Sequence, residues 1–328
     1  MHAAFYERTG PARDVLQWAE MPQPTPGPGE VRVRLRWSGL NPSDVKSRAG
    51  LRSSVLVFPR IVPHSDGMGV IDATGDGVAS ARLGERVWVW NAAWRRAFGT
   101  AAQYVVLPQA QAVVLPDATA DEAGACLGIP ALTALHAMLV GDGVAGRNVL
   151  VAGGAGAVGH YAVQFARLLG ARRVVATVSN AQKAALAVAA GADAAVNYRS
   201  ADAHEAIRQA VQGQDIDRVV EVDIAANAAL DVELIGPGGE CVVYGSGASQ
   251  FQLPFFPLIV KNIALHFFIV YNLSESDRQR AVSTLSGWLE RNQLSHQIGA
   301  RFALADIAAA HEAVEQGAVT GNVVLEVP

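Results

Sequence analysis

Cysteine is scarce in this chain of 328 residues, which contains only Cys126 and Cys241, far apart from each other. Two such residues exclude a disulfide framework and any zinc site built from four cysteines. Both stand among apolar neighbours, where a cysteine ordinarily acts as a small buried side chain. We expect that structural role for each of them.

An excess of one charge is also lacking, because 26 Lys and Arg stand against 30 Asp and Glu. A net charge of −4 favours neither nucleic acid nor an anionic membrane as a partner. No run reaches the roughly 20 apolar residues of a membrane span, and the first 14 residues carry charges without the apolar core of a secretory signal. We therefore expect a globular protein of the cytoplasm.

The first third of the chain predicts β-structure with long loops. Residues 31–37 (VRVRLRW) alternate apolar and charged side chains, the pattern of a half-buried strand. Further short strands are expected at 70–73, 86–90 and 104–107, separated by turns that contain glycine or proline. This pattern is typical of a small barrel-like domain.

From residue 121 the chain becomes rich in alanine and alternates helices with strands. We expect helices at 121–141 (broken or kinked at Pro130), 159–170, 181–190 and 202–211, and strands at 148–152, 173–178, 194–197, 219–222 and 240–244. Such alternation predicts a doubly wound parallel sheet. The tail adds a long apolar strand at 263–271, helices at 277–291 and 306–316, and a strand at 322–327.

The strongest chemical signal is the motif Gly154-x-Gly156-x-x-Gly159, which follows an expected strand and opens an expected helix. Glycines there permit a tight turn and let backbone N–H groups approach a pyrophosphate at the positive end of the helix. The motif predicts a dinucleotide site, with Ala157 and Val158 between the glycines as part of it. The alternative is a glycine-rich turn that binds no nucleotide.

The residues after the second strand favour NADP(H) over NAD(H). An NAD site expects an acidic residue about 20 positions beyond the glycines, but the strand at 173–178 is followed by Ser179, a candidate for the 2′-phosphate, and the next acid is Asp193. Lys183, Tyr198 and Arg199 follow and can donate hydrogen bonds to a 2′-phosphate. The alternative for the two cations is an ordinary solvated surface position.

Motifs along nearly the whole length give the chain a family resemblance. They are Gly39-Leu40-Asn41-Pro42-Ser43-Asp44, Ser65-Asp66-Gly67-Met68-Gly69-Val70-Ile71, Gly128-Ile129-Pro130-Ala131-Leu132-Thr133-Ala134, the glycine loop, Ala181-Gln182-Lys183, Val196-Asn197-Tyr198-Arg199, Tyr244-Gly245-Ser246, Ala310-His311-Glu312 and Gly321-Asn322-Val323-Val324-Leu325. With them the chain resembles the medium-chain dehydrogenases/reductases, in particular the quinone oxidoreductase (zeta-crystallin-like) branch.

The resemblance implies an α/β protein with two domains. A GroES-like β-barrel catalytic domain would be formed by residues 1–120 and 265–328, the latter including the sheet-edge strand 263–271. A Rossmann NADP-binding domain with a doubly wound parallel sheet would occupy residues 121–264.

The resemblance also implies that the reaction needs no zinc. Zinc-dependent members of the superfamily carry Cys, His and Cys at the positions that match Asn41, Ser65 and Ile129. These three side chains do not make the thiolate and imidazole set of a catalytic zinc. His64 is the neighbouring histidine, but it has no ligand partners at the other two positions, so we expect no metal site.

Without a metal, the acceptor must take a hydride readily, as quinones and α,β-unsaturated carbonyls do. The resemblance places around the coenzyme and substrate the residues Asn41, Thr133, Gly245, Ser246, Val270, Tyr271 and Asn322. Asn41 is the candidate amide donor of the substrate pocket. It can equally be a turn residue before Pro42, and both interpretations remain open.

The chain departs from the family at Lys46 and Arg52, positions where zeta-crystallin-like enzymes often carry tyrosines. The two cations could stabilise an enolate or bind an anionic group of the substrate, or they could point into solvent. They are substrate-pocket candidates, and their presence weakens the case for quinone specificity.

Three other functions compete with an NADPH-dependent reductase of a small electrophile. They are an enoyl-thioester reductase, a catalytically idle NADPH-binding protein and, as the least favoured, a zinc alcohol dehydrogenase. The long apolar strand at 263–271 would leave an unpaired sheet edge. We expect a homodimer that pairs these edges, as the family does.

Overall fold

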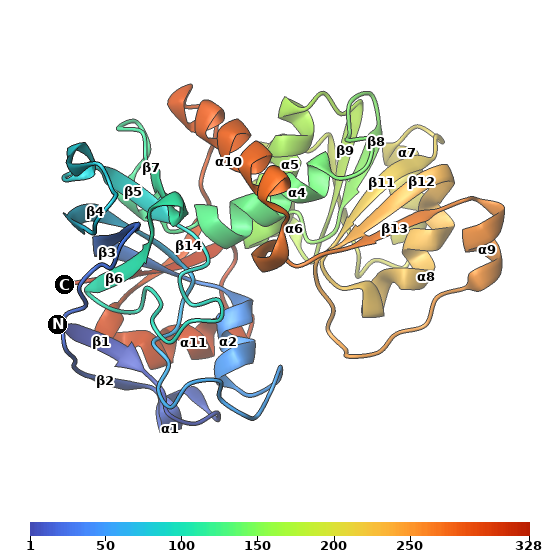
Figure 1. Cartoon of the computed structure of the whole chain (residues 1–328). Coiled ribbons are helices and arrows are strands. Elements are labelled where there is room, and N and C mark those ends of the chain that lie inside the picture. The colour runs from blue at the N-terminus through green and yellow to red at the C-terminus, as the bar shows by residue number, and fades with distance from the viewer. The chain divides into compact units, whose positions relative to one another are not determined.

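A computed structural model describes residues 1–328, which divide into two units (Figure 1). Unit 1 comprises Met1–Pro130 and Ser286–Pro328, and unit 2 comprises Ala131–Leu285. Both limits lie later in the chain than the expected 120 and 264. The first is later because helix α3 (Asp121–Gly124) packs on strands of unit 1, and the second because a strand and most of a helix after residue 264 belong to unit 2.

Unit 1 is built on strand β3 (Glu30–Leu40), which contains the alternating segment predicted at 31–37. Val31, Val33 and Leu35 are buried, whereas Arg32 turns outward and pairs with Asp72 at 2.9 Å. The prediction of a half-buried strand is confirmed. Burying each of these apolar side chains stabilises the fold by about 1.5–3 kcal/mol.

Strand β3 lies in a seven-stranded sheet, six strands of which have the order β14-β15-β3-β4-β5-β7. It pairs with β15 and β4 in that order, and also with the seventh strand, β6. A separate two-stranded sheet joins β1 and β2. The other strands of unit 1 are β1 (His2–Phe5), β2 (Gln17–Glu20), β4 (Asp66–Thr74), β5 (Arg86–Val89), β6 (Tyr104–Pro108), β7 (Ala112–Val114), β14 (Ile298–Ala303) and β15 (Asn322–Glu326).

Short helices complete unit 1, and both chain ends lie in it (Figure 1). Besides α3 they are α1 (Ala12–Val15), α2 (Pro42–Arg48), η1 (Ser80–Arg82), η2 (Gln109–Gln111), η5 (Leu304–Asp306) and α11 (Ile307–Glu315). A π-helical turn, η3 (Leu127–Ala131), contains Pro130 and separates α3 from the next helix. The helix predicted at 121–141 is therefore broken, as expected at that proline.

Unit 2 contains a six-stranded parallel sheet of order β10-β9-β8-β11-β12-β13, which confirms the predicted doubly wound sheet. Its strands are β8 (Asn148–Val151), β9 (Arg173–Val178), β10 (Ala194–Asn197), β11 (Ile216–Glu221), β12 (Ile235–Val243) and β13 (Ala264–Phe267). Strand β8 is buried along its whole length, as a central parallel strand requires.

The helices of unit 2 alternate with its strands along the chain. They are α4 (Leu132–Leu139), α5 (Ala157–Leu168), α6 (Ala181–Ala189), α7 (Ala203–Ala210), α8 (Ile224–Leu234), α9 (Phe255–Val260), η4 (Val270–Asn272) and α10 (Glu275–Glu290), which crosses the limit between the units. None of the helices has the length and apolar character needed to cross a membrane.

The strand predicted at 263–271 is wrong in length. It ends at Phe267, and the Phe268 N–H donates to the Val243 carbonyl at 3.2 Å before the chain turns into η4. A continuous apolar run does not distinguish a strand from a buried turn. The strand that remains, β13, does lie at an edge of the sheet.

Candidate dinucleotide and acceptor sites

The turn that joins β8 to α5 folds back on its own backbone. Gly153 has a φ of +67° and its N–H donates to Thr177 Oγ1 at 3.2 Å, while the Gly154 N–H donates to the Thr177 carbonyl at 3.0 Å. A Cβ on Gly154 would lie 2.5 Å from Ala176 Cβ, and one on Gly159 would lie 2.2 Å from the Gly153 carbonyl oxygen. Glycine at these two motif positions therefore lets the strand, the turn and the helix pack together.

The middle glycine of the motif faces open space. Gly156 is exposed and directly precedes α5, and a Cβ there would meet only the Gly153 carbonyl oxygen, at 3.2 Å. The N–H groups of the first helical residues, including Ala157 and Val158, have no acceptor within a helix, and the helix dipole adds positive charge. A pyrophosphate group fits this cradle, because no side chain fills it and backbone donors line it.

Polar side chains gather where β9 and β10 end side by side. Tyr198 follows β10, and its N–H donates to the carbonyl of the last residue of β9 at 3.0 Å, next to Ser179. Lys183 lies in the first turn of α6, where its N–H donates to the Asn180 side chain at 2.9 Å. The Arg199 guanidinium stands 5.8 Å from the centre of the Tyr198 ring. The structure thus brings Ser179, Tyr198 and the start of α6 to the same edge of the sheet as the glycine turn.

The next acidic residue in the sequence, Asp193, lies at the opposite end of these parallel strands, where they begin. Asp193 Oδ2 accepts hydrogen bonds from the N–H of Val174, near the start of β9, at 2.8 Å and from Arg167 at 3.1 Å. Its carboxylate therefore does not take the position at the end of β9 from which an acid binds the ribose of NAD.

The loops after β11 and β12 are tied to each other at the same edge. A Cβ on Gly245 would lie 2.2 Å from the Val222 carbonyl oxygen, so glycine is required there. Asp223 Oδ1 accepts from the Gly247 N–H at 2.6 Å, and Ser246 Oγ donates to the Ala248 carbonyl at 2.7 Å. Gly245 and Ser246 thus sit in a preorganised loop.

Three further predicted coenzyme residues of unit 2 are buried. Thr133 is on α4, and Val270 and Tyr271 begin η4, which packs against α4. Arg278 donates to the Val270 carbonyl and fixes this turn from within the unit. These three side chains therefore lie mostly in the interior of unit 2.

In unit 1, Asn41 is held by two buried carboxyl groups. Its backbone N–H donates to Asp44 Oδ2 at 2.8 Å and its Nδ2 donates to Asp66 Oδ2 at 2.9 Å. Asp66 Oδ2 also accepts from the Ile129 N–H at 3.0 Å. Asn41 is the residue that caps α2 before Pro42, so its turn role is present, and its amide keeps a second hydrogen that can be donated.

Burial shifts the acidity of both carboxyl groups. It raises the pKa of Asp44 to about 7, and the Asn41 N–H and the nearby Arg52 charge lower it only in part. It also raises the pKa of Asp66 well above the ordinary value, with the Asn41 amide opposing and Asp44 adding to the rise. Both groups resist ionisation because the charged form loses its hydration.

The remaining candidates of unit 1 lie on three different segments of the chain. Lys46 is in the last turn of α2, and Arg52 is exposed in the loop that follows this helix. Asn322 starts β15 and is buried, and its Nδ2 donates to the Gln297 carbonyl at 3.0 Å. That bond ties Asn322 to its own unit.

The positions that match zinc ligands hold side chains with other contacts. Asn41 and Ile129 are joined through Asp66, Ser65 is buried, and neighbouring His64 bonds Ser38 and His311. No group of three His, Cys, Asp or Glu side chains in the structure is arranged to hold a metal ion.

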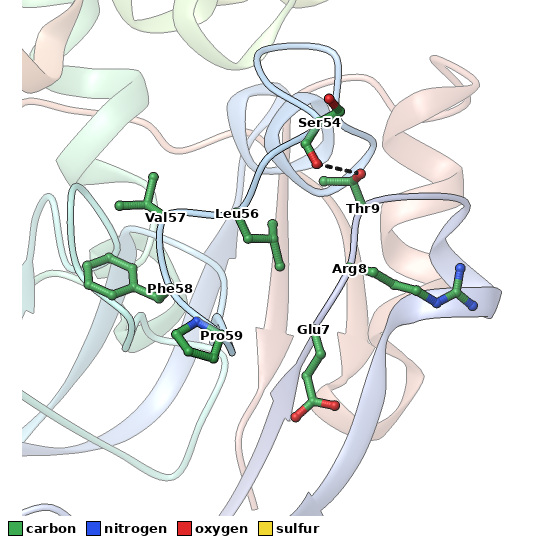
Figure 2. Close-up of a pocket in the computed structure, with 8 residues that line it drawn as sticks. All are labelled: Glu7, Arg8, Thr9, Ser54, Leu56, Val57, Phe58 and Pro59. Atoms are coloured by element: carbon green, nitrogen blue, oxygen red, sulfur yellow. Dashed lines mark hydrogen bonds between the residues drawn. The ribbon is translucent and has the colours of Figure 1, made fainter.

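Unit 1 also contains an open pocket with a volume of about 560 Å³. Figure 2 shows its lining, in which the Leu56 side chain points toward the chain segment that contains Thr9. The lining residues are Glu7, Arg8, Thr9, Ser54, Leu56, Val57, Phe58 and Pro59. None of the predicted site residues lines this pocket.

Sequence reasoning missed Gly153, Thr177, Asn180 and Asp66 as parts of these sites. Gly153 adjoins the motif, and its positive φ could have been suspected from the glycine pair at 153–154. Asp66 contacts residues 25 and 63 positions away. No local pattern in the sequence signals such long-range hydrogen bonds.

Comparison with known families matches both units. Residues 27–117 match the family model of the alcohol dehydrogenase GroES-like domain, and residues 157–287 match that of the zinc-binding dehydrogenases. The first model lies in unit 1, and the second starts at α5.

Several oxidoreductases are similar to this chain over nearly the whole length of both proteins. Human quinone oxidoreductase is 27% identical over 309 residues, which cover 94% of this chain and 92% of the relative. A solved NAD-dependent alcohol dehydrogenase is 29% identical with a TM-score of 0.89, and all of both chains is covered. A mycobacterial protein solved with NADPH is 26% identical with a TM-score of 0.86, over 99% of this chain and 100% of the other.

Proposed function

The chain belongs to the quinone oxidoreductase branch of the medium-chain dehydrogenases/reductases, and from this premise we propose that it is an NADPH-dependent reductase of quinones or α,β-unsaturated carbonyls. The observation that carries the proposal is the exposed glycine cradle, with hydrogen-bond donors and no carboxylate at the end of β9. The proposed reaction is a hydride transfer that does not use zinc.

Three groups of residues are proposed to hold three parts of the coenzyme. The cradle of Gly154, Gly156 and Gly159, with the N–H groups of Ala157 and Val158, binds the pyrophosphate. Ser179, Lys183 and Tyr198 bind the 2′-phosphate, to which a lysine supplies charge and hydroxyl groups supply hydrogen bonds. Thr133, Gly245, Ser246, Val270 and Tyr271 are proposed for the nicotinamide half, with Asn41 and Asn322 from unit 1.

When bound in this site, NADPH would supply a hydride to the electrophilic carbon of the acceptor and leave as NADP⁺, and a proton taken up from solvent would complete the reduction. The chain's own contribution is to orient the acceptor, exclude water and donate a hydrogen bond to the oxygen on which negative charge develops. We assign that donation to the Asn41 amide. Lys46 and Arg52 are proposed to favour acceptors that carry an anionic group.

The coenzyme assignment predicts that NADPH binds at least about tenfold more tightly than NADH, since a charge-assisted hydrogen bond contributes about 1.5–3 kcal/mol. Calorimetric titration of both coenzymes measures this ratio. Lys183→Ala should weaken NADPH binding and leave NADH binding unchanged. Arg208→Ala removes an equal charge from α7 and serves as the matched control. Tighter binding of NADH would overturn the assignment, and NAD dependence in one similar structure makes the comparison necessary.

The acceptor class is tested by following NADPH oxidation with a simple quinone, an enone and crotonyl thioester. We expect the quinone and the enone to be reduced, with no change in rate when a metal chelator is added. Preference for the thioester would favour the enoyl-thioester reductase instead. Tight NADPH binding without turnover of any acceptor would favour the idle binding protein.

We also propose a homodimer formed through the edge of the unit 2 sheet. Supporting it, β13 is an edge strand, and large apolar side chains on it and on α9 are exposed, with Phe255 at 69%, Phe256 at 72% and Phe267 at 55%. Such a surface favours association. Sedimentation should give twice the chain mass for the wild type and one chain mass for Phe267→Lys.

The control for the dimer is Val57→Lys, which places the same charge on a more exposed apolar residue of unit 1. We expect this variant to keep the wild-type mass. A monomeric wild type at micromolar concentration would refute the dimer without touching the proposed reaction.

A further inference from the structure

Asp66 links two segments that are far apart in the sequence. It is fully buried, and its Oδ2 accepts from Asn41 Nδ2 at 2.9 Å and from the Ile129 N–H at 3.0 Å. One donor precedes α2 and the other belongs to the π-helical turn η3. Both of these donors are uncharged amide groups.

The Ile129 N–H determines how the Asn41 amide is turned. Asp66 Oδ2 accepts from the Ile129 backbone N–H, so it is the acceptor oxygen of the group. An ionised carboxylate only accepts, and a neutral carboxyl group keeps its proton on Oδ1, because a carboxylic O–H oxygen is a weaker acceptor than the carbonyl oxygen. If the Asn41 amide were flipped, its Oδ1 would face that acceptor and the hydrogen bond would be lost. Asn41 therefore keeps Nδ2 toward Asp66 and retains one free Nδ2 hydrogen.

Asp66 itself is fixed from two sides. Thr100 Oγ1 donates to its backbone carbonyl at 2.5 Å. A Cβ on Gly128 would lie 2.3 Å from Asp66 Oδ1, so the carboxyl group packs directly against the glycine backbone. Oδ1 is buried and has no hydrogen-bond partner, so one oxygen makes both side-chain bonds.

We propose that Asp66 is a positioning residue for the reduction. Through its Oδ2 it directs the free hydrogen of the Asn41 amide to the acceptor oxygen. The inference rests on the proposed function, because Asn41 is the assigned donor there. Asp66 does not touch the acceptor and acts only through Asn41.

Four variants test this role in turnover with a quinone acceptor. Asp66→Leu keeps the size but removes the acceptor, and we expect kcat to fall about 30-fold with an unchanged Kd for NADPH. Asp66→Asn keeps an acceptor oxygen for both donors and should stay within about threefold of the wild type. Asn41→Leu removes the donor, and in that background Asp66→Leu should change kcat less than about twofold.

Two results would overturn the proposal. One is an Asp66→Leu effect that is just as large in the Asn41→Leu background, which would indicate a general structural role. The other is an Asp66→Asn variant as impaired as Asp66→Leu. Should Asp66→Leu fail to fold, Gly128→Ala displaces the carboxyl group while keeping both residues, and it must show the same dependence on Asn41.

A crystal structure separates this inference from the proposed function. If the wild type reduces no acceptor, the proposed function fails. The role of Asp66 is then tested only by the orientation of the Asn41 amide in crystal structures of the variants. We expect one orientation of the amide in the wild type and Asp66→Asn, and a rotated amide in Asp66→Leu or, failing that, Gly128→Ala. An unchanged amide in the variant that lacks the contact would refute the positioning role.

Discussion

Two buried histidines in unit 1 have their protons fixed by a chain of hydrogen bonds. Thr100 Oγ1 gives its hydrogen to the Asp66 carbonyl, so Ser38 Oγ must donate to Thr100 Oγ1 at 2.9 Å. Ser38 then accepts from His64 Nδ1 at 2.8 Å, and His64 Nε2 accepts from His311 Nε2 at 3.0 Å. Each ring is a neutral imidazole with one defined tautomer.

This pair makes the protein sensitive to acid. Burial lowers the pKa of His64 to about 3, and burial, then the neighbouring His64 and Arg48, lowers that of His311 well below its usual value. An unfolded histidine binds a proton below about pH 6.5. The stability that the neutral pair provides is therefore complete above that pH and is lost as the pH falls toward 3.

We predict that His311→Gln flattens the decline of the melting temperature between pH 6.5 and 4. The variant removes one group that must stay uncharged in the fold, and the glutamine amide can still donate to His64. Scanning fluorimetry across this pH range measures the effect, with His204→Gln on α7 as control. A decline as steep as that of the wild type would show that the pair does not limit acid stability.

The candidate site was predictable at residues whose roles are local. The glycine motif and the donors each follow a strand that the sequence predicts, and the structure places them where these parallel strands end. Asp66 was missed because its partners come from other segments. Asn322 was proposed for the coenzyme, although its amide hydrogen bonds to Gln297.

At the scale of elements, the turn before α5 contains one glycine that packing requires and another that is expected to matter for coenzyme binding alone. We predict that Gly159→Ala costs about 1–3 kcal/mol of stability, because its Cβ would press on the Gly153 backbone, and that it also weakens NADPH binding. Gly156→Ala should leave the melting temperature unchanged but weaken NADPH binding, since its methyl group enters the cradle. Thermal melts and fluorescence titration measure both, and wild-type affinity in Gly156→Ala would place the pyrophosphate elsewhere.

Elements were predicted well where apolar residues recur with one period. The strands at 173–178 and 194–197 were predicted with the bounds that β9 and β10 have. Helix α8 was missed because its alanine-rich sequence IAANAALDVEL gives little contrast between faces. Strand β13 was overextended, since the run IALHFFIVY stays apolar while its backbone leaves the sheet after Phe267.

At the scale of the whole molecule, one unit is made from a continuous segment of the chain and the other from two separate segments. All six strands of the unit 2 sheet come from the continuous segment Ala131–Leu285, whereas β3 of unit 1 pairs with β15 from the other end of the chain. We predict that residues 131–285 fold alone, with a cooperative melt by circular dichroism, and that residues 1–130 do not. A cooperative melt for 1–130, or none for 131–285, would contradict this.

The pairing of β3 with β15 also sets an order of events during synthesis. A nascent chain displays Glu30–Leu40 long before the ribosome reaches Asn322–Glu326, its partner along one side. Meanwhile the later segment can complete its own sheet once Phe267 has left the exit tunnel. Strand β3 must therefore wait, with one side uncovered, until β15 has been synthesised.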